Sequence, residues 1–307
     1  MFQIAKPIFF VCETPLHAGA GGGIGTELPI QREAHTQFPK VEASGIKGAF
    51  RDVFERAFKK NGKRNTDPDL VAVFGHPENG DENAGALGLT DGRILLFPVR
   101  SRQGVFAWTT CPRVLTRFER DLRVSAANDG GEAVKNLVDY VNAVPKNTVP
   151  QSSEIASGGK VFLEEYSIDV TKDTDVKGAT SAFAEALAEL LDIPELPSQF
   201  VVIPDEYFAD FVQHNTEVHT RIRIGENGVV EDGALFSEEH LPSESVLYSL
   251  VMAHPEFKKN GYDATKILKI FTDGLPEIVQ IGGNATLGKG IVRITKPFFE
   301  NEQATKS

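Results

Sequence analysis

Residues 282–290 read Gly-Gly-Asn-Ala-Thr-Leu-Gly-Lys-Gly, between two apolar runs, Glu277–Ile281 and Ile291–Ile294. This pattern predicts a strand, a glycine-rich loop and a second strand. Glycine permits a positive φ and lets a ligand approach the backbone closely, and exposed amides with one ammonium suit a phosphate-bearing partner. A flexible surface turn is the alternative, because a single glycine cluster matches many unrelated loops.

A second glycine-rich stretch runs from His17 to Thr36 and favours a binding role for the first. It is not a P-loop, because no Gly-Lys-Ser/Thr closes it. It is not a Rossmann turn either, because Gly25 is followed by Glu27, Pro29 and a polar run instead of the apolar stripe of a helix.

The composition predicts a soluble globular protein of one large or two small domains, with 307 residues, 24% charged side chains and a formal net charge of −11. The longest apolar runs, Pro7–Cys12 and Ile94–Val99, are much shorter than a membrane span, and Glu13 interrupts the first. We therefore expect a cytoplasmic protein with no membrane partner. Cys12 and Cys111 are expected to be buried free thiols. An acidic chain can bind nucleic acid only if its basic residues gather on one face.

A helix capped by Ser44 is predicted, because apolar residues recur at helical spacing as far as Phe58. Lys47 and Arg51 lie off its apolar stripe and are either nucleic-acid contacts or an ordinary solvated pair. An Asn-Gly pair within Gly225–Gly228 predicts a tight turn in a hairpin. The hairpin strands are Val218–Ile224 and Val229–Leu235. Other predicted strands are Arg93–Val99, Val105–Thr110, Lys160–Val170 and Phe200–Ile203. Predicted helices are Pro112–Leu122, Glu132–Val144, Ala179–Leu191, Asp205–His214, Ser243–Ala253 and Tyr262–Gly274, with a loop at Pro145–Gly159.

The irregular order of strands and helices favours an α+β sheet with helices mainly on one face over a doubly wound parallel sheet. Several ordered motifs also carry a resemblance that spans nearly the whole chain. The chain resembles the RAMP backbone subunits of type III-B CRISPR effector complexes, the fourth Cmr subunit of the Cas-seven-like family. The motifs are Pro29-Ile-Gln-Arg-Glu33, Ser44-Gly-Ile-Lys-Gly-Ala-Phe-Arg51, Leu96-Phe-Pro-Val-Arg-Ser101, Thr220-Arg-Ile-Arg223, Gly233-Ala-Leu-Phe-Ser-Glu-Glu-His-Leu-Pro242 and the glycine-rich loop 282–290.

The resemblance implies a single RAMP domain over residues 1–307. Its RRM-like (ferredoxin-like) palm would be built from N- and C-terminal segments, with inserted fingers, a helical region and a thumb β-hairpin at about residues 215–240. Copies of the subunit would stack with other Cmr subunits in a helical filament on a crRNA. Each thumb would wedge into the duplex of crRNA and target RNA and flip a nucleotide at regular intervals.

The family also cleaves the target RNA. The resemblance implies attack by a ribose 2′-hydroxyl, dependent on a divalent metal (Mg or Mn) and on no organic cofactor, that leaves a cyclic phosphate. Glu27 stands where relatives carry aspartate and is the candidate base and metal ligand. Because glutamate is longer and more mobile, a non-catalytic scaffold that only holds crRNA and target stays open. His17, Glu238 and His240 are further catalytic candidates, each with a structural alternative.

RNA backbone contacts give affinity without sequence selectivity, which suits a subunit that accepts any guide. The residues assigned to this role by resemblance are Arg32, Ser44, Lys47, Arg51, Arg221, Gly282, Gly283, Asn284, Thr286, Gly288, Lys289 and Gly290. The remaining histidines have no metal-pair spacing and are expected to be surface or structural residues. They are His35, His76, His214, His219 and His254. An unrelated nucleotide-binding metabolic enzyme is a third hypothesis, but no base-recognition or hydride-transfer motif accompanies the glycine-rich loops.

Overall fold

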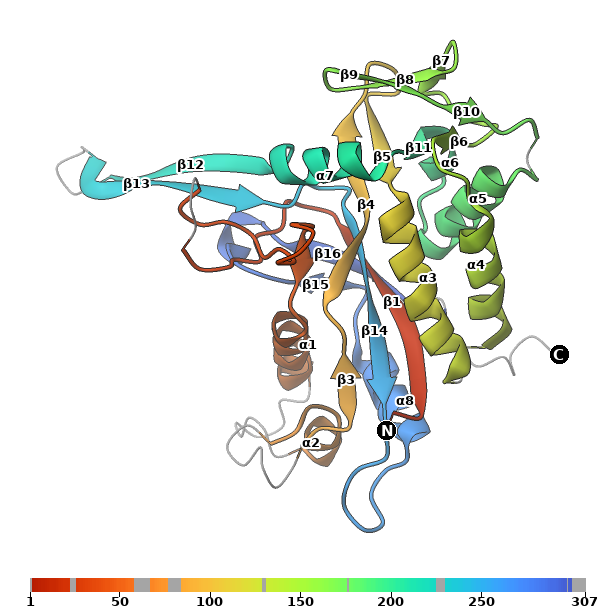
Figure 1. Cartoon of the computed structure of the whole chain (residues 1–307). Helices are drawn as coiled ribbons and strands as arrows, with labels where there is room; N and C mark the ends of the chain where they lie inside the picture. Colours follow the sequence, from red (N-terminus) through yellow and green to blue (C-terminus); the bar gives the residue numbers. More distant parts are fainter. Residues whose placement is uncertain are drawn as a thin grey trace.

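A large mixed sheet forms the centre of the molecule in the computed structural model (Figure 1). The structure describes residues 2–22, 26–57, 67–76, 84–128, 131–175, 177–224, 230–296 and 298–299. The main path of the sheet is β10-β6-β11-β5-β4-β14-β1-β16-β15, while β2 pairs with β4 and β3 with β14. The strands are β1 (Ile4–Cys12), β2 (Lys40–Val41), β3 (Leu87–Leu89), β4 (Gly92–Arg100), β5 (Phe106–Thr110), β6 (Thr148–Val149), β10 (Thr171–Lys172), β11 (Phe200–Val202), β14 (Val246–Ala253), β15 (Ile278–Gln280) and β16 (Ile291–Thr295).

Strands from the N-terminal and C-terminal parts of the sequence lie side by side in this sheet. Strand β1 lies between β14 and β16 and is antiparallel to both, with Ile4 opposite Ala253 and Val11 opposite Arg293. Parallel pairing occurs between β11 and β5 and between β10 and β6. The mixed α+β class expected from the sequence is therefore confirmed.

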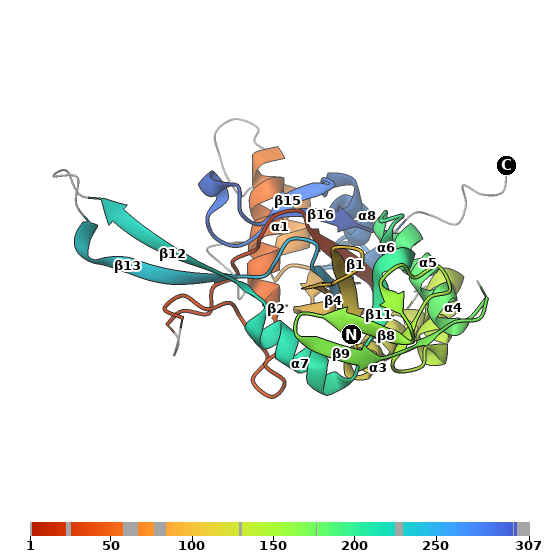
Figure 2. The same cartoon turned by 90° about the horizontal axis from the view of Figure 1, so that it is seen from above.

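Helices cover both faces of the sheet, so the expectation of helices mainly on one face is wrong. Successive strand residues point to opposite faces. The Phe10 ring lies 6.2 Å from that of Phe50 in α1, and the Phe9 ring lies 6.1 Å from that of Phe118 in α3. Figure 2 shows α1 and α3 on opposite sides of β1. The helices are α1 (Ala43–Ala57), α2 (Pro68–Phe74), α3 (Pro112–Ala127), α4 (Gly131–Ala143), α5 (Ala179–Leu191), α6 (Leu196–Gln199), α7 (Asp205–His214), α8 (Ala264–Gly274) and the 3-10 turn η1 (Ala285–Leu287).

Three predicted elements need correction. The segment Ser243–Ala253, expected to be a helix, contains the central strand β14. The segment Lys160–Val170, expected to be one strand, is a hairpin of β8 (Lys160–Leu163) and β9 (Tyr166–Asp169), because Glu164 has a φ of 48° and turns the chain. The predicted loop at Pro145–Gly159 contains β6 and also β7 (Ala156–Ser157), which pairs with β8.

Helix α1 begins one residue before Ser44, so Ser44 lies in the first helical turn and is not the cap. The first N–H of the helix, at Ala43, instead donates to Asp91 Oδ1 at 2.9 Å. Asp91, in the turn between β3 and β4, therefore caps the helix in place of the local serine that we expected from the sequence.

A long hairpin of β12 (Glu217–Ile224) and β13 (Val230–His240) projects from the body of the molecule (Figures 1 and 2). Its strands are antiparallel, with His219 opposite Glu238 and Thr220 opposite Ser237. The predicted tight turn at Gly225–Gly228 lies outside the described residues. The hairpin itself is confirmed.

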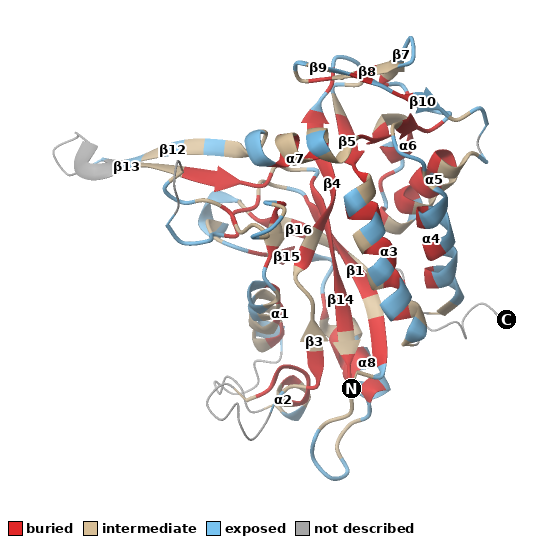
Figure 3. Cartoon of the chain, in the orientation of Figure 1, coloured by how far each residue is buried: buried red, intermediate tan, exposed pale blue. Residues whose placement is uncertain are grey.

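Burial is greatest along the central strands and decreases along the hairpin (Figure 3). Cys12 and Cys111 are buried free thiols, as predicted, and burial raises the pKa of both well above its usual value. Of the helices that the structure describes, none combines the length and the apolar character needed to span a bilayer.

Candidate functional site at the base of the hairpin

Glu238 joins the hairpin to the glycine-rich loop. Its side chain is buried, and Oε1 accepts a hydrogen bond from Asn284 Nδ2 at 2.6 Å. The other oxygen, Oε2, lies 2.7 Å from Arg221 Nε on the neighbouring strand. His17 Nε2 lies 3.6 Å from Glu238 Oε1. Three residues that the sequence singled out in separate stretches therefore meet around the carboxylate of a fourth, Glu238.

Three imidazole rings form a row beside this carboxylate. The ring of His240 lies 5.5 Å from that of His17 and 5.0 Å from that of His219. His240 is fully buried, and neither of its ring nitrogens has a hydrogen-bond partner among the described residues. Burial lowers the pKa of His240 to about 4, opposed by Glu238 and reinforced by Lys289. His240 is therefore neutral at pH 7.

From the sequence we expected His219 to be a surface or structural residue, but in the structure its ring belongs to this row. No local motif marks it, because its position depends on the pairing that sets residue 219 opposite Glu238. The only sequence signal is its place next to the Thr220-Arg-Ile-Arg223 motif.

Glu27 lies along the outer edge of β13. Its Oε2 accepts a hydrogen bond from the backbone N–H of Ser237 at 2.8 Å, and its own N–H donates to Ser237 Oγ at 3.2 Å. Leu28 continues the contact by pairing in parallel with Glu238. Glu27 is exposed. The structure therefore holds this candidate residue next to Glu238 along the strand, with its side chain open to solvent.

Arg32 fixes the segment that carries Glu27 to the hairpin. Its Nη2 donates to Glu239 Oε1 at 2.5 Å, and its Nη1 donates to the carbonyl oxygens of Gln37 and Val212, each at 2.8 Å. Glu239 Oε2 also accepts from the N–H of Ile30 at 3.0 Å. With 15% of its side chain exposed, Arg32 is a positioning residue in this structure, and its RNA contact stays a prediction.

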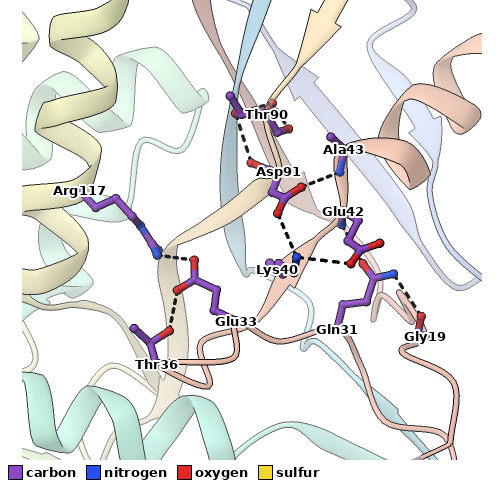
Figure 4. A network of polar contacts seen from close by, with 11 residues as sticks. Gly19, Gln31, Glu33, Thr36, Lys40, Glu42, Ala43, Thr90, Asp91 and Arg117 are labelled. Atoms are coloured by element: carbon purple, nitrogen blue, oxygen red, sulfur yellow. Dashed lines mark hydrogen bonds and ion pairs between the residues drawn. The ribbon is translucent and has the colours of Figure 1, made fainter.

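A second polar network holds the following segment in place (Figure 4). Glu33 accepts hydrogen bonds from Thr36 Oγ1, at 2.6 Å, and from Arg117 Nη1 of α3. Burial acts to raise the pKa of the Glu33 carboxyl, but these two hydrogen bonds outweigh burial and hold that pKa below its usual value. Asp91 similarly accepts from Lys40 Nζ at 3.0 Å. Residues 33–40 are thus attached to the body of the protein at both ends.

The two glycine-rich stretches pack against each other. The N–H of Gly283 donates to the carbonyl of His17 at 2.9 Å, and the N–H of Gly290 donates to that of Pro15 at 2.9 Å. Gly282 has a φ of 80°, and a Cβ there would lie 2.3 Å from the His17 oxygen. The loop is exposed at Thr286 and Gly288. Its first and last glycines therefore allow close packing, and its middle faces solvent.

The candidate RNA-binding residues on α1 are separate from the histidine row. Lys47 Nζ donates to the carbonyl of Leu87 at 2.7 Å, and burial, with a smaller effect of Arg51, lowers the pKa of Lys47. Arg51 Nε pairs with Glu55 Oε1 at 2.7 Å, and Ser44 is exposed. Lys289, by contrast, is close enough to His240 to lower its pKa.

The described residues contain no group of three His, Cys, Asp or Glu side chains arranged to hold a metal ion. Mg²⁺ does not need such a cage, because it retains several waters and commonly uses one or two carboxylates together with substrate phosphates. The exposed carboxylate of Glu27 fits a site of this kind.

A model of the RAMP superfamily matches residues 9–293, and the chain belongs to this superfamily. Within it, the chain is 36% identical over 301 residues to the CRISPR system Cmr endoribonuclease Cmr4 of Pyrococcus furiosus, with 95% of each chain covered. It is 24% identical to the CRISPR system CMR subunit Cmr4 of Saccharolobus solfataricus, covering 95% of this chain and 96% of that one.

Solved structures show the same relationship. The crystal structure of oligomeric Cmr4 from Pyrococcus furiosus matches with a TM-score of 0.68 at 29% identity, covering 95% of this chain and 96% of the other. A chain in the cryo-EM structure of type III-B Cmr-beta bound to cognate target RNA matches with a TM-score of 0.76, covering 96% and 97%. Its identity is 22%, so this second match bears on the fold alone.

Proposed function

We propose that the chain is a backbone subunit of an RNA-guided type III-B CRISPR (Cmr) complex, where it binds crRNA and target RNA and cuts the target at regular intervals. The observation that carries the proposal is the 36% identity to a Cmr endoribonuclease across 95% of both chains. A homologous Cmr4 is oligomeric in its crystal structure, which supports stacking of copies of this chain. The complex would work in the cytoplasm.

In this proposal the sheet around β1, β14 and β16, with α1 and α8, is the RRM-like palm. The hairpin of β12 and β13 is the thumb, and its projection from the body supports its insertion between guide and target (Figure 1). The elements from α3 to α7 form the inserted fingers and helical region. The proposal assigns guide contact to the exposed middle of the glycine-rich loop and to Lys289, with Lys47 and Arg51 extending the contact along α1.

Cleavage would begin with the 2′-hydroxyl of a nucleotide displaced by the thumb. The 2′-oxygen attacks the adjacent phosphorus, the P–O5′ bond breaks, and a 2′,3′-cyclic phosphate remains. Displacement of the nucleotide permits in-line alignment, which supplies much of the rate. Glu27 accepts the proton of the 2′-hydroxyl. A divalent cation held by Glu27 would stabilise the negative charge that develops on the phosphorane.

The position of Glu27 supports this role despite the expected aspartate. The reciprocal hydrogen bonds with Ser237 fix the backbone of residue 27 beside the thumb, and Arg32 and Glu239 fix the residues that follow. An exposed carboxylate in a fixed backbone can approach a bound ribose without a large rearrangement.

The test is an assembled complex with a crRNA and a matched, end-labelled target RNA. The proposal predicts regularly spaced products that require Mg²⁺ or Mn²⁺ and that end in a 2′,3′-cyclic phosphate. A mismatched target is the control and should stay intact. A complex that binds the matched target without cutting it would support the non-catalytic scaffold instead. A purified chain that assembles with no RNA would contradict both.

A further inference from the structure

His219 is the most accessible imidazole of the histidine row. Its side chain is 41% exposed, whereas that of His17 is 11% exposed and that of His240 is fully buried. Only an accessible ring can reach an RNA phosphate without rearrangement of the hairpin. The row therefore leads from a buried, neutral ring to one that a substrate can contact.

Each of the other two rings is limited by its surroundings. His17 Nδ1 donates to the carbonyl of Glu239 at 2.7 Å, which fixes that ring to the backbone. The low pKa of His240 keeps it neutral near pH 7. Neither ring is placed to give a proton to a substrate at the surface.

A carboxylate orients His219. Glu217 is two residues earlier on β12, and its Oε2 lies 3.3 Å from His219 Nε2. In the imidazolium both nitrogens carry a proton. Pairing of Nε2 with Glu217 leaves the Nδ1 proton for another acceptor. Around the ring, β13 contributes Glu238 and His240, and β12 also contributes Arg221, which is paired with Glu238.

His219 and Glu27 lie on opposite edges of the same strand. Glu27 contacts β13 at Ser237, and His219 pairs with β13 at Glu238. Two strand spacings correspond to about 10 Å between the backbones of the two residues. Leu28, which pairs with Glu238, shares the face of the hairpin that carries His219, and Glu27 is exposed at the adjoining edge of β13. A phosphate bound over β13 would therefore lie between the exposed side chains of Glu27 and His219.

We propose that His219, oriented by Glu217, is the general acid of the cleavage reaction. This inference rests on the proposed function. As the 2′-oxygen forms its bond to phosphorus and its proton passes to Glu27, the P–O5′ bond breaks and the His219 imidazolium gives its Nδ1 proton to the departing 5′-oxygen. The products are a 2′,3′-cyclic phosphate and a 5′-hydroxyl. Exchange of both protons with water restores the starting protonation states of Glu27 and His219.

A target RNA with sulfur in place of the bridging 5′-oxygen tests this role, because a thiolate leaves without protonation. His219→Ala should cut the ordinary target about 100-fold or more slowly, the size of effect typical of a general acid. The same variant should cut the 5′-thio target at the rate of the parent. His219→Gln, which keeps a polar side chain on β12, should behave in the same way. Glu27→Ala should cut both targets slowly, because sulfur at the leaving position does not replace the base that removes the proton of the 2′-hydroxyl.

His214→Ala is the matched control, because His214 also pairs with a carboxylate, Asp210 at 2.9 Å, but lies on α7 with 70% of its side chain exposed. It should cut both targets at the parent rate. A His219→Ala complex that binds target and cuts both substrates at the parent rate, or both equally slowly, overturns the assignment. A parent complex that binds target and cuts neither substrate overturns the proposed function itself, and the assignment with it.

Discussion

The carboxylate of Glu27 accepts a hydrogen bond from the backbone N–H of Ser237, and the N–H of Glu27 donates to the side chain of the same serine. This reciprocal contact joins a segment near the start of the sequence to the base of the hairpin. Because the donor to the Glu27 carboxylate is the backbone amide of Ser237, that hydrogen bond depends on the path of β13 and not on the serine side chain. Any movement of the hairpin base would therefore move the candidate catalytic carboxylate.

The pair of Arg32 and Glu239 should make a large contribution to stability. Their side chains are only 15% and 8% exposed. Glu239→Ala leaves the guanidinium without its carboxylate and should lower the free energy of unfolding by about 3–5 kcal/mol. Chemical denaturation of the purified chain measures this. The exposed pair of Lys269 and Asp273 is the control, and Lys269→Ala should change the free energy by less than about 0.5 kcal/mol. Equal effects at the two sites would contradict the positioning role.

Gly282→Ala should destabilise the protein more than Gly288→Ala. Both glycines have a positive φ, so each substitution carries a left-handed backbone cost of roughly 1–2 kcal/mol. Only the Cβ at position 282 would also collide with the carbonyl oxygen of His17, at 2.3 Å, whereas nothing lies within 4 Å at position 288. Thermal unfolding compares the two variants. A Gly288→Ala variant with the lower Tm would show that the packing of the two glycine-rich stretches is unimportant.

Acid should destabilise the protein through His240. Its pKa is about 4 in the folded protein, against 6.5 for an ordinary histidine. The unfolded chain therefore binds more protons between these values, so stability falls as the pH is lowered from about 6.5 and the loss is complete near pH 4. The difference in pKa corresponds to about 3 kcal/mol.

His240→Phe removes this titration, so its free energy of unfolding should depend less on pH between 6.5 and 4 than that of the parent. Denaturant titrations at several pH values measure the slope. His214→Asn, at an exposed site, should retain the parent slope. If the free energies of unfolding of the parent and of His240→Phe fall equally between pH 6.5 and 4, the buried His240 ring does not cause the acid destabilisation.

Lys289→Ala should weaken retention of the guide RNA and reduce the salt dependence of binding, by a slope of about one for a lost phosphate contact. Lys47→Ala should also lower stability, because its ammonium donates to the carbonyl of Leu87. The double variant should lose more guide than either single variant. RNA content and binding at several salt concentrations measure both effects. Lys135→Ala, on the exposed face of α4, is the control. Unchanged RNA content and slope in the double variant would exclude these contacts.

Elements with one buried face were predictable from the sequence, and α5 begins and ends at the predicted residues, Ala179 and Leu191. The central strand β14 could not be predicted in this way, because almost all of its residues are buried. A strand buried on both faces lacks the alternation that distinguishes it from a buried helix. The buried hydroxyl of Ser249 in this strand donates to the carbonyl of Thr90, 159 positions away in the sequence.

The candidate site was predictable where a motif marked it and not where it depends on pairing between strands. His17, Glu238 and His240, which the resemblance assigned to one site, lie close together, and their catalytic role stays a prediction. Asn284, assigned instead to guide contact, also meets Glu238. His219 does not stand out in the sequence, because the register of β12 on β13 places it beside Glu238. The role of Glu239 was missed for the same reason, since its partners Ile30 and Arg32 are more than 200 positions away.

Replacement of Glu27 tests the central claim most directly. Complexes assembled with Glu27→Ala, Glu27→Asp or the parent chain are given the same matched target, and target binding and Mg²⁺-dependent products are measured in parallel. Loss of a contact made only in the transition state lowers the cleavage rate without lowering affinity. We expect Glu27→Ala to bind target like the parent and to yield no regularly spaced products, and Glu27→Asp to cut at least as fast as the parent. Regular cleavage by Glu27→Ala at the parent rate would contradict the account.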